Sequence, residues 1–165
     1  MSHETMERIY YVQKDVIPVA LCWLPARMST PEAIAMLLAI GLQESKFEYR
    51  KQVGGPAKGF WQFEMGGGVR GVLTHGTTGP LVLPVLKLLG YSQDSRACYD
   101  AIQHNDVLAA VFARLLLWAT PGRLPTMKET EKAWLYYLDG WRPGKPHPQT
   151  WEKNFNLAWD LVTQE

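Results

Sequence analysis

A carboxylate follows directly on the most apolar segment of the chain. Residues 33–42 are apolar or glycine throughout, and Gln43, Glu44 and Ser45 come next. If residues 31–45 form a buried helix, burial and the negative end of the helix dipole both disfavour a charged Glu44 and raise its pKa. A carboxylic acid that stays protonated near neutral pH can act as a general acid. The alternative is a solvated glutamate at a helix end, which is the commoner situation.

The segment GGPAKGFWQFE, residues 54–64, has the composition of a ligand-binding loop. Glycines such as Gly59 let the backbone approach a ligand closely. Gln62 can hydrogen-bond hydroxyl or acetamido groups, and Glu64 is a second carboxylate or, alternatively, a solvated loop acid. Three aromatic side chains offer flat faces for sugar rings: Phe60, Trp61 and Phe63. Two carboxylates beside a cleft are the usual arrangement for cleaving a glycosidic bond.

Helices are the elements that must position these residues. A first helix is expected over about 4–24 with a kink near Pro18, and Thr30-Pro31 signals the start of a central helix that runs to about Ser45. Residues 48–79 hold most of the 14 glycines and predict a loop, with short strands possible at 59–63. Further helices are predicted at about 80–89, 94–103, 105–119, 126–138 and 148–163. The expected class is mainly α with a Gly-rich loop or short β excursion after the central helix.

Composition narrows the function classes. The 165 residues suit a single domain, 1–165, and 47% apolar with 20% charged residues is ordinary for a soluble globular protein. The net charge of +1, without a Lys/Arg block, argues against a nucleic-acid partner. The longest apolar run is shorter than the roughly 20 residues that span a bilayer, so no membrane insertion is expected.

Secretion signals, disulfides and cofactors are also not indicated. The N-terminus carries Glu4 and Glu7 and lacks a basic n-region, so no signal peptide is predicted. Cys22 and Cys98 lie in apolar surroundings and are expected to be buried free thiols. The four histidines have no metal-ligand spacing, so no metal or other cofactor is predicted.

Two motifs together resemble the goose-type lysozyme and soluble lytic transglycosylase superfamily. Its members commonly show E-S-x-F, then G-L-M-Q, then A-Y-N-A-G. The first is present as Glu44-Ser45-Lys46-Phe47, and the second as Gly59-Phe60-Trp61-Gln62. The third is weaker, with Tyr137 and Gly140 matching within residues 136–140. The resemblance covers roughly residues 31–140, and it departs from the usual pattern at Phe60-Trp61 and Leu138-Asp139.

The resemblance implies a small α-rich lysozyme-like fold and a function. The substrate would be the peptidoglycan glycan strand, cut at the β-1,4 bond between N-acetylmuramic acid and N-acetylglucosamine. Glu44 would be the catalytic acid, and Ser45 would help to position the bond being cut. Gln62 would line the central subsite, the backbone of its loop would hold an acetamido group, and Tyr137 would lie on the far wall near Glu44.

Glu64 bears on the type of reaction. Goose-type hydrolases commonly carry an Asp two places after the motif glutamine, where it helps to position the attacking water, and Glu64 stands at that place. In many transglycosylases this place is not acidic, and the substrate's own C6 hydroxyl attacks to form a 1,6-anhydro end. Lytic transglycosylase is the first expectation, and a lysozyme-type hydrolase that uses Glu64 is the second.

The segment Trp141-Arg142-Pro143-Gly144-Lys145-Pro146 is a candidate lip of the cleft. Trp141 would stack on sugar, while Arg142 or Lys145 would meet peptide or lactyl carboxylates. The loop is similar to those of phage-borne wall-degrading domains; its alternative is a plain surface turn.

Two functional alternatives remain open at this point: a non-catalytic virion or wall-binding protein, and a helical interaction module. As a bacteriolytic enzyme, the protein would act on the cell wall or in the periplasm as a monomer. It would arrive through a phage particle or a holin-type pore, or as part of a larger virion or secretion assembly.

Overall fold

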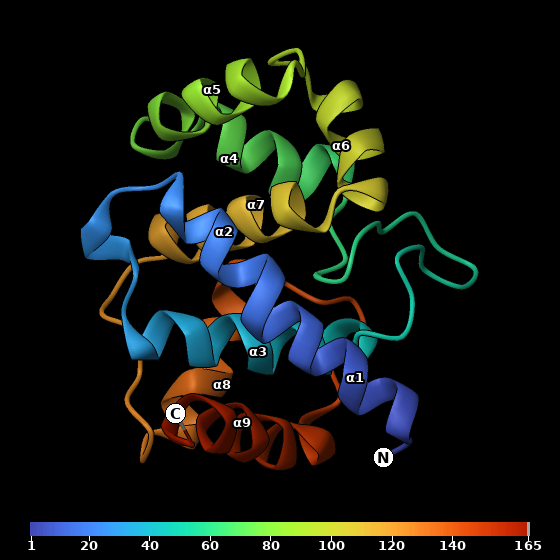
Figure 1. Ribbon diagram of the computed structural model, residues 1–165, viewed down its shortest axis with the longest axis vertical. Helices are drawn as coiled ribbons and strands as arrows, with labels where there is room; N and C mark the ends of the chain where they lie inside the picture. Colours follow the sequence, from blue (N-terminus) through green and yellow to red (C-terminus); the bar gives the residue numbers. More distant parts are fainter. Residues whose placement is uncertain (165) are drawn as a thin grey trace.

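The computed structural model describes residues 1–164 and is mainly helical, as predicted (Figure 1). The elements in chain order are α1 (His3–Tyr11), the π-helical turn η1 (Val12–Val16), α2 (Ile17–Cys22), the 3₁₀ turn η2 (Ala26–Met28), α3 (Pro31–Ser45), the π-helical turn η3 (Met65–Val69), α4 (Arg70–Thr74), α5 (Thr78–Leu89), α6 (Ser95–His104), α7 (Asp106–Ala119), α8 (Thr130–Trp141) and α9 (Pro148–Thr163).

The N-terminal helical segment matches the expected helix with a kink. Elements α1, η1 and α2 follow one another without a loop, and the wider π-helical turn η1 lies just before Pro18. Proline has no N–H to donate to the carbonyl four residues earlier and its ring crowds that carbonyl. A π-helical turn at this place accommodates both effects. In Figure 1 this segment crosses in front of the other helices.

Helix α3 is the central buried helix that the apolar run predicts. Thr30 caps it, since its Oγ1 accepts a hydrogen bond from the backbone N–H of Ala33 at 3.2 Å, and Pro31 occupies the first turn. Residues 35–42 are all buried. The helix packs mainly against α9 and also against α7.

The helices form two groups around this core. Figure 1 shows α4, α5, α6 and α7 in the upper part and α3, α8 and α9 in the lower part, with α1 and α2 across the front. Nearly all the buried apolar side chains from Ile9 to Leu161 belong to one connected cluster. Helix α7 contributes to it along nearly its whole length and contacts α2, α3 and α5, so it links the two groups.

Residues 46–64, between α3 and η3, form a loop. The loop predicted over 48–79 is therefore confirmed only in its first part; η3 and α4, residues 65–74, are helical there, so the prediction is wrong for its second part. The short strand considered at 59–63 is not present; within residues 1–164 only two isolated antiparallel bridges occur there, Lys51 with Lys58 and Lys58 with Phe63. The helix predicted at about 126–138 begins later, at Thr130, and continues to Trp141. The residue before it, Glu129, instead accepts hydrogen bonds from Arg123 and Thr126.

The surface departs from one sequence expectation. Both cysteines are free, but only Cys98 is buried. The prediction of a buried thiol is therefore wrong for Cys22, which is exposed near the end of α2.

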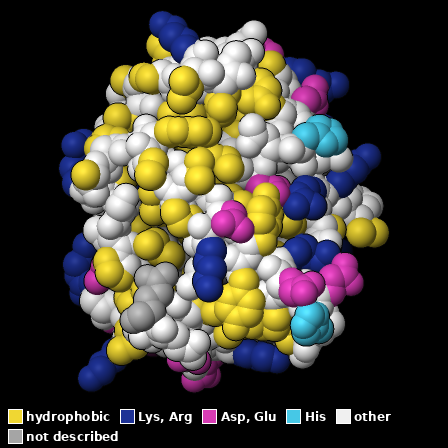
Figure 2. All heavy atoms as spheres, in the orientation of Figure 1, with side chains coloured by type: hydrophobic (Ala, Val, Ile, Leu, Met, Phe, Trp, Pro, Cys, Tyr) yellow, Lys and Arg dark blue, Asp and Glu magenta, His cyan; other side chains and the backbone are white. Residues whose placement is uncertain are grey.

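Figure 2 shows acidic and basic side chains interspersed on one face rather than gathered in a block of one sign. Across residues 1–164, no single helix is both long enough and apolar enough to cross a membrane; only η3–α4 and α5 taken together, bent by 99°, have that length and composition.

Candidate active site

The end of α3 has an unusual backbone that fixes the position of Glu44. Lys46 and Phe47 both have left-handed conformations, with φ of 55° and 54°. This turn folds the Phe47 ring back onto the helix, against Gly41. A Cβ atom at Gly41 would lie 2.1 Å from Cζ of Phe47, so only glycine fits there. Glu44 thus lies in the last turn of α3, and the Phe47 ring packs against the preceding turn of the same helix.

Ser45 has a different role from the one predicted. It is 1% exposed, and its hydroxyl donates a hydrogen bond to the carbonyl of Phe60 at 2.7 Å and accepts one from the N–H of Phe47 at 3.1 Å. The predicted role of Ser45 in positioning the bond being cut is therefore wrong for this structure, in which the hydroxyl is buried and bonded within the protein. Ser45 ties the Gly-rich loop to the end of α3.

The aromatic residues of the loop point inward. Phe60, Trp61 and Phe63 are at most 1% exposed, so the prediction that they stack on sugar rings is wrong for this structure. The Trp61 indole N–H donates to the carbonyl of Leu37 at 2.8 Å, and Phe60 and Trp61 both meet the ring of Phe47 edge to face. These rings anchor the loop on α3 instead of binding ligand.

Gly59 and Gln62 shape the turn that follows. Both have positive φ, 77° and 53°, and both the backbone N–H and the side-chain Nε2 of Gln62 donate to the carbonyl of Gly59, at 3.0 and 2.8 Å. A Cβ at Gly59 would lie 2.7 Å from Cγ2 of Ile102, so this position requires glycine on two grounds. Gln62 is half-buried beside the loop backbone.

Glu44 and Tyr137 form the polar centre of the site. The Tyr137 hydroxyl donates a hydrogen bond of 2.7 Å to the Glu44 carboxylate. Burial raises the pKa of Glu44 to about 7; the Tyr137 hydrogen bond acts in the opposite direction, and the negative charge of Glu64 raises the pKa further. Glu44 is therefore a half-buried acid whose proton is exchangeable near neutral pH.

Helix α9 holds Tyr137 in place. The phenol ring is 2% exposed and stacks on the indole of Trp151, with centroids 5.2 Å apart and planes 6° apart. Burial, reinforced by the Glu44 carboxylate, raises the pKa of Tyr137, so this hydroxyl keeps its proton and acts as a donor. The position of Tyr137 against Glu44 is the one that the resemblance implies.

The remaining predicted residues lie around this centre. Glu64 is exposed and influences Glu44 through its charge. Trp141 is half-buried, packs near Tyr137 and Phe63, and donates from its indole N–H to the carbonyl of Trp61 at 2.9 Å. Arg142 is exposed, ends α8 with φ of 48°, and donates to the carbonyl of Asp139 at 3.3 Å.

Two supporting residues were not predicted as part of the site. Gln43 binds α9 from the last turn of α3: its Nε2 donates to the carbonyl of His147 at 2.8 Å, and its Oε1 accepts from Asn154 at 2.8 Å. Asp106, in the first turn of α7, forms a two-bond ion pair at 2.8 and 2.9 Å with Arg50, whose guanidinium carbon lies 4.3 Å from the ring centroid of Phe60. Neither partner is indicated by local sequence, because both bonds join residues far apart in the chain.

Some features fall outside this centre. In residues 1–164, no group of three or more His, Cys, Asp or Glu side chains is arranged to hold a metal ion. Two cavities, of about 530 and 470 Å³, are lined by other residues than Glu44.

No protein-family model, curated protein or solved structure matches the chain significantly.

Proposed function

We propose that this protein cleaves the glycan strands of peptidoglycan, with Glu44 as general acid and then general base. The proposal includes a lysozyme-like arrangement of the helices. It rests on the residues of the site, because no relative supports it.

One observation carries the proposal: the three motif segments meet through side-chain hydrogen bonds. Ser45 joins the end of α3 to the carbonyl of Phe60 at 2.7 Å, and Trp141 joins the end of α8 to the carbonyl of Trp61 at 2.9 Å. Between them, Tyr137 bonds Glu44 at 2.7 Å. Segments up to 93 residues apart in the chain therefore assemble around one acid with a raised pKa. Perturbed carboxyls in such assemblies are typical of catalytic sites.

The proposed reaction is that of a lytic transglycosylase. The protonated Glu44 gives its proton to the glycosidic oxygen between N-acetylmuramic acid and N-acetylglucosamine, and the bond to the muramic C1 breaks. The substrate's acetamido oxygen stabilises the cationic C1. The Glu44 carboxylate then takes the proton of the muramic C6 hydroxyl as O6 bonds to C1. The 1,6-anhydro product forms, no water is consumed, and Glu44 is protonated again.

A hydrolase is the second candidate, and Glu64 is the observation that favours it. Its negative charge raises the pKa of Glu44. It is exposed, which leaves it free to orient a water molecule. Inverting and retaining glycosidases both use such a second carboxylate. In this version water supplies the oxygen and a reducing end results.

Mass spectrometry of the soluble fragments from purified peptidoglycan tests the proposal. Fragments with 1,6-anhydro ends support the transglycosylase, and fragments with reducing ends support the hydrolase. No release of fragments from walls of several chemotypes would contradict both enzymes and favour a wall-binding protein.

A further inference from the structure

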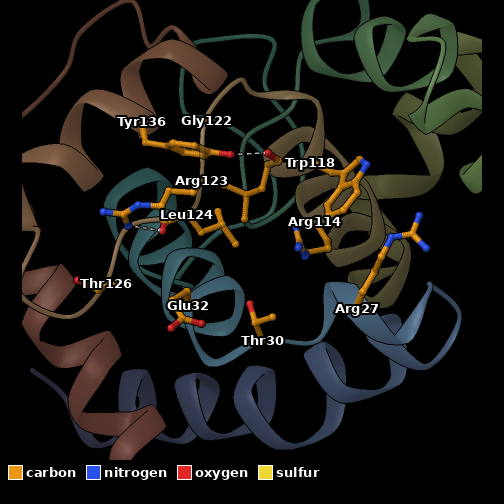
Figure 3. Close-up of a pocket in the computed structure, with 11 residues that line it drawn as sticks. Arg27, Thr30, Glu32, Arg114, Trp118, Gly122, Arg123, Leu124, Thr126 and Tyr136 are labelled. Carbon is orange, nitrogen blue, oxygen red and sulfur yellow. Dashed lines mark hydrogen bonds between the residues drawn. The ribbon is translucent and has the colours of Figure 1, made fainter.

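A second site candidate lies at the opposite end of α3 from Glu44. A cavity of about 530 Å³ opens between the start of α3, the last turns of α7 and residues 122–126 (Figure 3). This volume is in the usual range for small-molecule sites. Glu32, on its wall, precedes Glu44 by twelve residues in the same helix, which corresponds to about 18 Å along the axis. The cavity is therefore separate from the site proposed above.

Arg114 is the residue that makes this cavity unusual. Its side chain is 2% exposed, yet it forms no ion pair with any carboxylate in residues 1–164. Its Nε donates to the carbonyl of Met28 at 2.8 Å, while its Nη1 is buried without a hydrogen-bond partner. Burial lowers the pKa of Arg114 to about 10, so it remains a cation at neutral pH. Burying a cation without an anion is costly.

The other charges around the cavity do not neutralise Arg114. Arg123 is already paired with Glu129 through two hydrogen bonds of 2.8 and 2.9 Å. The positive charge of exposed Arg27 and the negative charge of half-buried Glu32 cancel in the sum of charges around the cavity. One positive charge, that of Arg114, is left over. A ligand with a single negative charge would balance it, whereas a dianion would place surplus negative charge beside Glu32.

The wall beside Arg114 is apolar and aromatic. The Trp118 ring lies between two guanidinium groups. The Cζ atoms of Arg27 and Arg114 are 5.4 and 5.6 Å from its ring centroid. Leu117 and Leu124 complete this side. Figure 3 shows the Arg114 guanidinium in the middle of the ring of lining residues, with Trp118 next to it. The cavity thus offers a cation for a carboxylate and an apolar face for the rest of a ligand.

We propose that this cavity binds a small monocarboxylate with an apolar body, with the carboxylate at Arg114 and the body against Trp118, Leu117 and Leu124. A planar guanidinium matches the two oxygens of a carboxylate. This site is independent of the glycan-cleaving function.

Nuclear magnetic resonance titration of the ¹⁵N-labelled protein with benzoate tests the assignment. Saturable shifts of the Trp118 indole and Arg114 Nε signals are expected. Benzamide, which has the same shape without the charge, is expected to bind at least about tenfold more weakly, since a charged partner for a buried cation is lost. Inorganic phosphate is expected to bind more weakly than benzoate. No saturable shift with benzoate, equal binding of benzamide, or tighter binding of phosphate would each overturn the proposal.

A pair of variants adds a second readout. Arg114→Met removes the buried cation with a side chain that suits an apolar setting, and Arg70→Met removes an exposed arginine outside the cavity. Circular dichroism verifies folding of both. Arg114→Met is expected to lose benzoate binding by at least about tenfold, and Arg70→Met to keep it. Unchanged binding in folded Arg114→Met would overturn the proposal; if that variant does not fold, the wild-type titration decides.

Discussion

Three neighbouring effects shift the pKa of Glu44, two of them upward and one downward. Burial raises it most, the Tyr137 hydrogen bond lowers it, and the charge of Glu64 raises it. The result is a pKa of about 7 instead of the ordinary value of 4.5. Under the proposed function, glycan cleavage that needs protonated Glu44 should therefore fall as the pH rises through about 7.

Replacing Tyr137 by Phe should raise the pKa of Glu44. The hydroxyl donates to the carboxylate and stabilises its charged form, so its loss favours the protonated form, by about one pH unit. Carbon-13 resonances of labelled glutamate carboxyls across a pH titration measure this. Tyr136→Phe is the matched control, because within residues 1–164 the Tyr136 hydroxyl bonds only the carbonyls of Leu117 and Thr120. A lower pKa in Tyr137→Phe would contradict this description of Glu44.

Replacing Glu64 by Gln should lower the pKa of Glu44, because a neighbouring negative charge is removed. Glu64 is exposed, so the change should be a few tenths of a unit at low salt and smaller at high salt. The same variant separates the two reactions: a transglycosylase should lose little activity, while a hydrolase that uses Glu64 should lose about 100-fold or more. An unchanged pKa at low salt would contradict the coupling between the two acids.

Replacing Glu44 by Gln should stabilise the fold at high pH. Because the folded pKa of Glu44 is raised, the native state binds its proton more readily than the unfolded state, and ionisation at pH 8 destabilises the fold. At pH 8 the amide should therefore raise the free energy of unfolding by about 1–2 kcal/mol, and near pH 5 by less. Urea unfolding at both pH values measures this. A gain that is larger at pH 5 than at pH 8 would refute the raised pKa.

At the scale of elements, local signals predicted most of the helices, but not η3 and α4, because the four glycines of residues 65–74 disfavour a helix. The Thr30-Pro31 cap and the apolar run of α3 were predicted from neighbouring residues, and the structure confirms them. The orientation of the loop aromatics was not predictable. Whether a side chain in a Gly-rich loop faces inward depends on the backbone conformation at positions such as Gly59 and Gln62, and composition does not specify it.

Gly41 supplies a prediction at this scale. Gly41→Ala should destabilise the protein by about 1–3 kcal/mol, because the added methyl overlaps the buried Phe47 ring. Gly71→Ala is the matched control: it is also a helical glycine, but its Cβ would meet no atom within 4 Å, so it should be neutral or stabilise by up to about 1 kcal/mol. Thermal unfolding of both variants measures the difference, and equal stability would contradict the packing of Phe47 on α3.

At the scale of the whole molecule, the site depends on contacts between distant segments. Trp151 of α9 stacks on Tyr137, and Gln43 bonds α9 beside His147, so α9 fixes both partners of the Glu44–Tyr137 pair. The helix at about 148–163 was predicted, but the part of Trp151 in positioning Tyr137 was not. Periodicity identifies which face of a helix is buried and not which residue lies against it.

The central claim is that Glu44 supplies the proton for glycan cleavage, and one measurement tests it most directly. Release of soluble fragments from purified peptidoglycan is compared between wild type and Glu44→Gln, with circular dichroism to verify that both are folded. The Gln side chain keeps the shape and an acceptor for Tyr137 but has no acidic proton. We predict a loss of activity of at least about 100-fold in the folded variant. Cleavage at the wild-type rate by folded Glu44→Gln would contradict the account.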